Sequence, residues 1–122
     1  SDSLENVELF CKTMQLDWFF KIEDLKLHNM VDENGNNLSG GQKQLIGIAR
    51  ALYQSAPILV LDEPTASMDK ECELEVIQLL FRLKKDMIII MITHKPEIAK
   101  MSDKIYILDN KHMTVCDDYL LL

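Results

Sequence analysis

The spacing of apolar residues in the second half of the chain predicts alternating helices and strands. From Ser39 onward, apolar residues recur at the i, i+3, i+4 and i+7 positions of one helix face; they are Leu45, Ile48, Ala49 and Leu52. Two short runs, Ile58–Leu61 and Met87–Ile92, are apolar at every position. Continuous apolar runs are typical of parallel strands buried on both faces, so we expect each strand to be covered on both sides.

Another helix is expected between the two apolar strands. Asp69 is a candidate N-cap, and the residues expected on its buried side are Val76, Ile77, Leu80 and Leu83. A strand, a helix and a strand in this order predict a parallel sheet with a right-handed crossover, and therefore an α/β fold. A short helix after Pro96 and a hairpin of Ile105–Leu108 and Met113–Cys116 around Asn110-Lys111 are predicted to follow.

The N-terminal third reads as mainly helical. Asp2 or Ser3 is placed to cap a first helix, whose apolar face is predicted to hold Val7, Phe10, Cys11 and Met14. Leu16–Ile22 is predicted to form a second short helix, with three aromatic residues for core packing, and Asp32–Asn37 a loop.

Composition excludes several classes of protein. The net charge of −7 argues against unaided nucleic-acid binding, which needs a basic face. The longest apolar run has six residues, whereas a membrane span needs about 20, and no signal peptide is visible. The three cysteines form no CxxC pair, which favours reduced thiols in a cytoplasmic setting over a metal site.

Polar residues follow both predicted strands, where ligands bind in open parallel sheets. Asp62 and Glu63 come after the first strand and His94 after the second. Asp62 is placed to hold Mg²⁺, directly or through water, Glu63 to act as a general base toward a water molecule, and His94 to contact a phosphate or orient that water. Each alone could be a solvated residue at a strand end, which is the usual case for a lone histidine there, but three together at one edge favour a site.

The start of the helix after Leu38 is a candidate anion site. Ser39 and Gln42 fit a capping box, which an ordinary helix start would also explain. The glycines Gly40 and Gly41 are not explained in that way, because each costs roughly 1 kcal/mol against alanine inside a helix. Two glycines would let a phosphate approach the free N–H groups and the positive helix end.

These motifs together resemble those of ATP-binding cassette (ABC) ATPases. Leu38–Gln42 resembles the family's signature motif, Ile58–Glu63 its Walker B strand with the catalytic glutamate, Ala66–Asp69 its D-loop and His94 its switch histidine. The resemblance covers about residues 32–109. Within the family, Val31–Gly35 resembles the exporter loop that touches the membrane domain.

The chain also departs from the family pattern. The family usually has a basic residue at Leu45, serine at Ala66 and leucine at Met68. No G-x-x-x-x-G-K-[ST] P-loop occurs; Gly35 and Gly40 have the glycine spacing, but Gly41-Gln42 follows. The resemblance therefore implies the C-terminal part of an ABC ATPase domain, excised or truncated and inactive alone. Residues 1–37 would belong to the helical subdomain and the exporter-like loop, and residues 38–122 to the signature helix and the ATPase core.

The resemblance also implies cofactors, partners and site residues. ATP and Mg²⁺ would be bound, with Asp62 as the metal ligand and Glu63 and His94 as catalytic residues. The nucleotide-binding residues would be Ser39, Gly40, Gly41, Gln42 and Asp69, with the glycine-rich segment covering ATP held by a second nucleotide-binding domain in a head-to-tail dimer.

The parent protein would be an exporter that couples ATP hydrolysis to transport. This domain would lie on the cytoplasmic side of the membrane, attached to a transmembrane domain, and no nucleic acid is expected as a partner. In a complete domain, the P-loop strand and helix would supply part of the cover for the two apolar strands. Without them, this chain is expected to keep an open edge and an exposed apolar face, and therefore to self-associate. Alternatives are a soluble ABC ATPase acting on nucleic acid or ribosomes and a non-catalytic interaction fragment.

Overall fold

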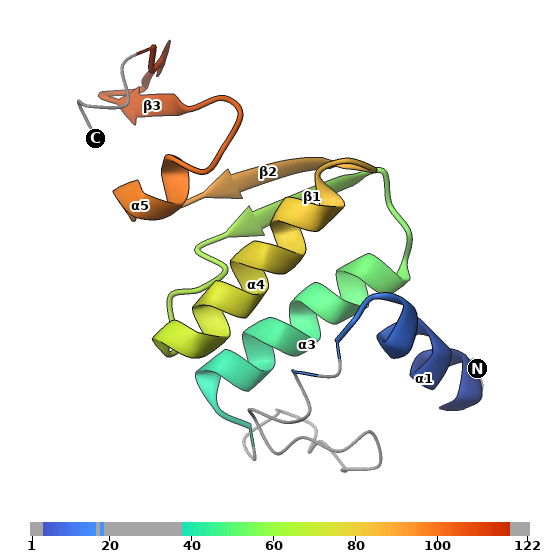
Figure 1. Ribbon diagram of the computed structural model, residues 1–122. Coiled ribbons are helices and arrows are strands. Elements are labelled where there is room, and N and C mark those ends of the chain that lie inside the picture. The colour runs from blue at the N-terminus through green and yellow to red at the C-terminus, as the bar shows by residue number, and fades with distance from the viewer. Residues whose placement is uncertain (1–3, 17, 19–37, 118–122) are drawn as a thin grey trace.

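The computed structural model describes residues 4–16, 18 and 38–117, and it has the predicted α/β order (Figure 1). The central elements are α3 (Gly40–Tyr53), β1 (Ile58–Asp62), α4 (Lys70–Leu83) and β2 (Ile88–Ile92). Before them lies α1 (Leu4–Thr13), and after them α5 (Pro96–Ala99), β3 (Tyr106–Asp109) and β4 (His112–Val115). The strand boundaries differ from the sequence prediction by at most one residue.

The strands form two separate pairs. β1 and β2 pair in parallel, from Ile58 opposite Ile88 to Asp62 opposite Ile92, and α4 makes the crossover between them. β3 and β4 form the predicted antiparallel hairpin. Asn110 and Lys111 have φ of 46° and 66°, which matches the two left-handed residues of the tight turns that suit hairpin twist.

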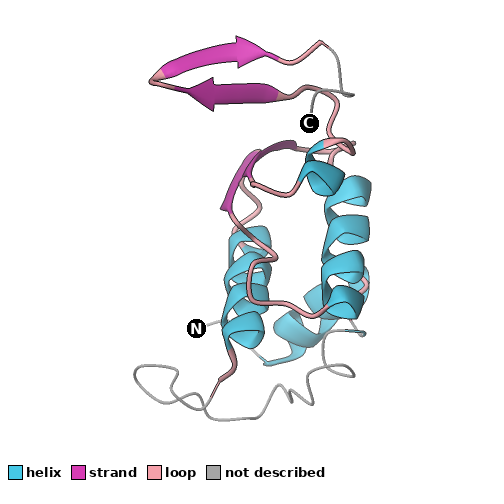
Figure 2. Ribbon diagram, turned by 90° about the vertical axis from the view of Figure 1, so that its left-hand side faces the viewer, coloured by secondary structure: helices cyan, strands magenta, loops and turns pink. Residues whose placement is uncertain are grey.

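The core lies between the helices and one face of the β1–β2 pair. α3 and α4 lie on the same side of these strands (Figures 1 and 2). The buried residues of the two helices are Leu45, Ile48 and Leu52 of α3 and Cys72, Val76, Ile77, Leu79 and Leu80 of α4. Leu59 and Leu61 of β1 face them and are buried. Ala49 and Leu83, also predicted for the buried faces, are half-buried.

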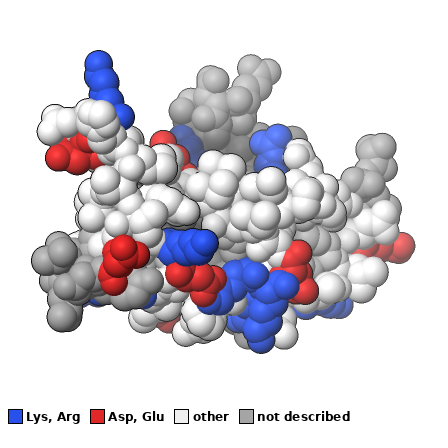
Figure 3. All heavy atoms as spheres, turned by 90° about the horizontal axis from the view of Figure 1, so that it is seen from above, with Lys and Arg blue, Asp and Glu red and all other residues white. Residues whose placement is uncertain are grey.

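The other face of the strand pair is open in the described residues, which confirms the expected exposed apolar face. The exposed apolar side chains, which we call the open sheet face, are Ile58, Val60, Ile88, Ile90 and Ile92. The physical reason is that both helices lie on one side, so alternate strand residues have no covering element in the described part. Seen from above, uncharged atoms cover most of the centre of the molecule (Figure 3).

The N-terminal helix packs on this core through the predicted face. Cys11 is buried, whereas Val7, Phe10 and Met14 are half-buried. The Phe10 ring meets the Tyr53 ring edge-on, with the centroids 5.0 Å apart. The predicted cap at Asp2 or Ser3, most of the helix over Leu16–Ile22 and the segment 31–37 lie outside the described residues.

Across residues 4–16, 18 and 38–117, no helix is both long enough and apolar enough to cross a bilayer.

Candidate functional site

The ends of β1 and β2 bring the predicted polar residues to one sheet edge. Because Asp62 lies opposite Ile92 in the parallel register, the residues that follow the two strands emerge together. The Glu63 backbone N–H donates to the Ile92 carbonyl at 2.9 Å, which extends the pairing by one residue. Glu63 and His94 are thereby brought into contact, as the strand-end pattern indicated.

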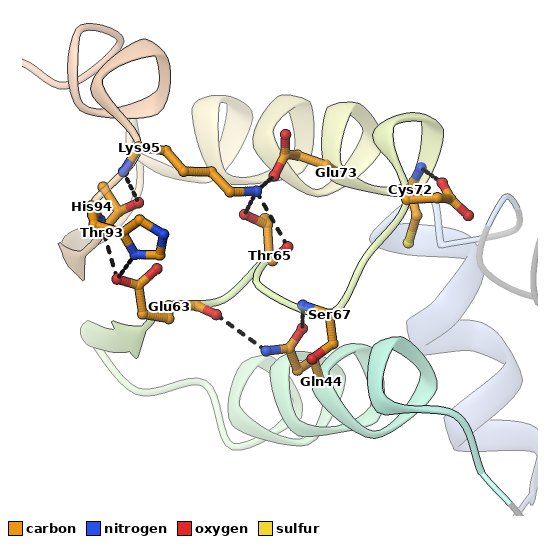
Figure 4. Close-up of polar contacts among 10 residues, drawn as sticks. Gln44, Glu63, Thr65, Ser67, Cys72, Glu73, Thr93, His94 and Lys95 are labelled. Atoms are coloured by element: carbon orange, nitrogen blue, oxygen red, sulfur yellow. Dashed lines mark hydrogen bonds and ion pairs between the residues drawn. The ribbon is translucent and has the colours of Figure 1, made fainter.

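Glu63 and His94 form a direct side-chain pair. Glu63 Oε1 lies 2.6 Å from His94 Nδ1 and also accepts from the His94 backbone N–H at 3.1 Å (Figure 4). The histidine side chain is 75% exposed and that of the glutamate 31%. A carboxylate oxygen at this distance is an acceptor for a proton on His94 Nδ1, which leaves Nε2 outside the pair. The pair can therefore hold a carboxylate and a histidine in fixed relation at an accessible edge.

The backbone of Glu63 adopts a left-handed conformation. Its φ is 45°, a region that a residue with a side chain adopts at a cost of about 1–3 kcal/mol unless its surroundings enforce it. Its carbonyl accepts from Ala66 N at 3.2 Å and from Gln44 Nε2 at 3.1 Å. These bonds, together with those from the β2 side, fix the direction in which the Glu63 carboxylate points.

Asp62 lies at the exposed end of β1. It lines an open hollow of about 220 Å³ between α3 and β1, with Gln44, Gly47 and Val60 among the other lining residues. Within the described residues, no group of three or more His, Cys, Asp or Glu side chains is placed to hold a metal. The single carboxylate of Asp62 is sufficient for a Mg²⁺ ion whose other ligands are phosphate oxygens and water. Proteins commonly bind that ion in this way.

The start of α3 confirms the predicted capping box. Ser39 Oγ accepts from the Gln42 N–H at 3.1 Å, and the Ser39 N–H donates to Gln42 Oε1 at 2.8 Å. These two bonds satisfy donors that a helix start otherwise leaves free. Ser39 and Gly40 are exposed, whereas Gly41 is buried.

The double glycine has a packing reason inside the chain. A Cβ on Gly40 would lie 3.0 Å from Ser67 Cβ, and one on Gly41 would lie 3.1 Å from the Ser67 carbonyl oxygen. Both distances are shorter than ordinary van der Waals contact. The glycines therefore let α3 approach the loop between β1 and α4, which is a reason for them besides the anion site inferred from the sequence.

The structure confirms Asp69 as the predicted N-cap of α4. Its Oδ1 accepts from the Cys72 N–H at 2.8 Å, at the start of α4. This bond accounts for an aspartate at this position without a ligand, and a nucleotide-binding role for Asp69 stays a prediction.

Sequence reasoning missed two sets of contacts around this site (Figure 4). The first is Gln44, whose Oε1 accepts from Ser67 N at 3.2 Å while its Nε2 bonds to the Glu63 carbonyl. The second is a cluster in which Lys95 Nζ contacts Glu73 Oε2 and lies 3.4 Å from Thr65 Oγ1. No spacing or composition signal marks these residues, because their partners lie 19 to 30 positions away.

The Lys95 cluster ties both strand ends to α4. Thr65, two residues after Glu63, is 2% exposed, and its carbonyl also lies 3.5 Å from Lys95 Nζ. The hydrogen bond from Lys95 holds the pKa of Glu73 below its ordinary value of 4.5, with burial opposing that shift. The charged form of Glu73 is therefore the one that the folded structure favours.

Known proteins similar to this chain include a flippase and a transport ATP-binding protein. The ATP-dependent lipid A-core flippase of Pseudoalteromonas translucida (strain TAC 125) is 46% identical over 107 residues, which are 86% of this chain and 18% of that protein. The lactococcin-G-processing and transport ATP-binding protein LagD of Lactococcus lactis subsp. lactis is 40% identical over 105 residues, which are 86% of this chain and 15% of that protein. The chain thus spans less than a fifth of these relatives.

The fold is similar to that of a solved transporter. A bacterial Atm1-family ABC exporter with ATP bound superposes with a TM-score of 0.78 at 28% identity, over 93% of this chain and 20% of the exporter chain. A family model described as ABC transporter matches residues 5–66. That match covers half of the chain and includes both the glycine-rich start of α3 and the residues that end β1. The chain therefore belongs to the ABC transporter family.

Proposed function

We propose that this chain is part of the ATP-hydrolysing domain of an ABC exporter, which couples hydrolysis to transport across a membrane. The observation that carries the proposal is the Glu63–His94 pair at the carboxyl edge of the β1–β2 sheet. The names of the relatives, a flippase and a transport ATP-binding protein, support an exporter. Those names and the net charge of −7 disfavour the soluble ABC ATPase acting on nucleic acid or ribosomes.

The two strand ends have complementary roles in this proposal. ATP supplies the phosphate bond that is broken, and Mg²⁺ neutralises phosphate charge. Asp62 offers that ion a carboxylate, and Glu63 accepts the proton of the attacking water. His94 orients the Glu63 carboxylate through Nδ1 and presents Nε2 toward the substrate side.

The glycine-rich start of α3 serves a second nucleotide-binding domain in this proposal. Ser39, Gly40, Gly41 and Gln42 cover ATP bound to that domain in a head-to-tail dimer, with Asp69 in the adjoining loop. Ser39 and Gly40 are exposed and available to such a partner. The other partner is the transmembrane domain, which places this domain on the cytoplasmic side of the membrane.

The test is a substitution in the full-length transporter that contains this chain. Glu63→Gln should lower the ATP hydrolysis rate by about 10²–10⁴, the typical value of a general base, while MgATP binding is retained. Phosphate release and equilibrium binding of MgATP measure the two quantities. The matched control is Glu5→Gln, an exposed glutamate on α1, which should leave both unchanged. A Glu63→Gln variant that hydrolyses ATP at the parental rate would contradict the proposal.

A further inference from the structure

The Gln44 side chain joins α3 to the loop that carries Glu63. Gln44 lies two residues after the capping-box glutamine and is half-buried. Its amide donates from Nε2 to the Glu63 carbonyl at 3.1 Å and accepts at Oε1 from Ser67 N at 3.2 Å. Figure 4 shows this side chain reaching from α3 toward the segment that follows β1. One side chain thus pins that segment at two points.

The restraint matters because Glu63 is held in an unfavourable backbone conformation. Its φ of 45° persists only where neighbouring groups enforce it. β2 and the residues after it restrain its N–H and carboxylate, through Ile92 and His94. The carbonyl is restrained by Ala66 of the same turn and by Gln44. Among the described hydrogen bonds, the one from Gln44 to the Glu63 carbonyl is therefore the direct contact between α3 and the Glu63 backbone.

The second bond of Gln44 reaches a part of the loop that already packs on α3. Ser67, which donates to Gln44, is also the residue that the missing side chains of Gly40 and Gly41 accommodate. The first two turns of α3 and the loop thus interlock through glycine packing and through the Gln44 amide. Losing Gln44 leaves the packing in place but frees the Glu63 carbonyl from the helix.

We propose that Gln44 is a positioning residue for Glu63: its amide holds the Glu63 backbone in the conformation that directs the carboxylate toward His94. Gln44 acts through Glu63, because its amide nitrogen is bonded to the Glu63 carbonyl and its amide oxygen to Ser67 N. The inference rests on the proposed function, since it assigns Gln44 a part in ATP hydrolysis. A purely structural role would instead make Gln44 a clip between α3 and the loop, with no specific effect on the chemical step.

The experiment compares two variants of Gln44 in the full-length transporter. Gln44→Met removes both hydrogen bonds at similar length. Gln44→Glu keeps an oxygen to accept from Ser67 but replaces the amide that donates to Glu63. We expect both variants to lower kcat about three- to tenfold, the scale of one hydrogen bond, with KM for MgATP within about twofold. Gln78→Met and Gln78→Glu, at an exposed position of α4, are the controls and should retain the parental kcat.

A double variant shows whether the effect passes through Glu63. In single-turnover measurements, Gln44→Met should cause no further loss when Glu63 is already Gln, because the positioned group is gone. A full additional loss in that background would overturn the proposal, and so would a parental kcat for Gln44→Glu. If Glu63→Gln itself keeps the parental rate, the proposed function fails. If Glu63→Gln is impaired while Gln44→Met is not, the positioning role alone fails.

Discussion

Breaking the ion pair between Lys95 and Glu73 should destabilise the folded chain by about 2 kcal/mol. Removing one partner of a fully buried pair costs about 3–5 kcal/mol, whereas exposed pairs contribute about 0–1 kcal/mol. The Lys95 and Glu73 side chains are 25% and 18% exposed, so the pair lies between these limits. Lys95 also approaches the buried Thr65 hydroxyl at 3.4 Å, and this contact is lost when Lys95 becomes Met.

The same pair gives stability a defined dependence on pH. The Lys95 hydrogen bond lowers the pKa of Glu73 below 4.5, so the folded state binds the Glu73 proton less readily than the unfolded state. The stabilisation is therefore fully present above about pH 4.5 and is lost as the pH falls through the folded pKa. Glu73→Gln removes this contribution, and the variant should lose less stability than the parent on acidification.

Urea unfolding of the 122-residue chain measures both effects. Trp18, the single tryptophan, packs against the core and reports unfolding by fluorescence. A double-mutant cycle gives the coupling energy of the pair. It compares the free energies of unfolding of the parent, Lys95→Met, Glu73→Gln and the double variant, at neutral pH and near pH 3.5. The exposed pair of Lys84 and Asp103 is the matched control, because its atoms are 2.6 Å apart but the aspartate side chain is 76% exposed.

The two pairs should differ clearly in coupling energy. The control cycle, with Lys84→Met and Asp103→Asn, should give less than about 1 kcal/mol. The reasoning is refuted if the Lys95–Glu73 coupling is no larger than that of the control. It is also refuted if the coupling is unchanged between the two pH values.

Three further predictions concern packing, capping and association. Gly41→Ala should lower the free energy of unfolding, because the new Cβ would lie 3.1 Å from the Ser67 carbonyl oxygen. Gly47→Ala, with open space around the new Cβ, should raise the free energy of unfolding by up to about 1 kcal/mol. Equal urea midpoints for the two variants would contradict this prediction. Asp69→Ala should cost about 1 kcal/mol in the same assay and Asp69→Asn only a few tenths, because asparagine still caps. The parent chain should sediment as a dimer or larger at tens of micromolar and Ile90→Lys, on the open sheet face, mainly as a monomer; a monomeric parent would show that this face does not drive association.

Much of the site could be predicted from the sequence because its signals are local or follow from strand geometry. The Ser39–Gln42 capping box depends on residues three apart, and its two bonds are present as expected. The contact of Glu63 with His94 is long-range, 31 positions apart. It was still predictable, because parallel strands joined by a crossover must end at the same sheet edge.

The burial of the strands could not be read from their apolar pattern alone. Ile58–Leu61 is apolar at every position, yet Leu59 is 5% exposed and Val60 63% exposed. An apolar run indicates that both faces of a strand are suited to burial. The placement of α3 and α4 decides which face of the β1–β2 pair is buried. Likewise, the two glycines of α3 indicated a close approach, and the structure identifies one close neighbour as the Ser67 loop.

The sequence by itself determined the order of helices and strands, the caps of α3 and α4, and the sheet edge where Glu63 and His94 meet. Those features depend on residue spacing, capping chemistry and the pairing of parallel strands. Only the tertiary structure decided that Gln44 bonds to the Glu63 carbonyl and that Lys95 pairs with Glu73. Both contacts depend on how α3 and α4 are rotated and placed against the strand ends. Packing of the whole core sets that rotation, and no local pattern in the chain encodes it.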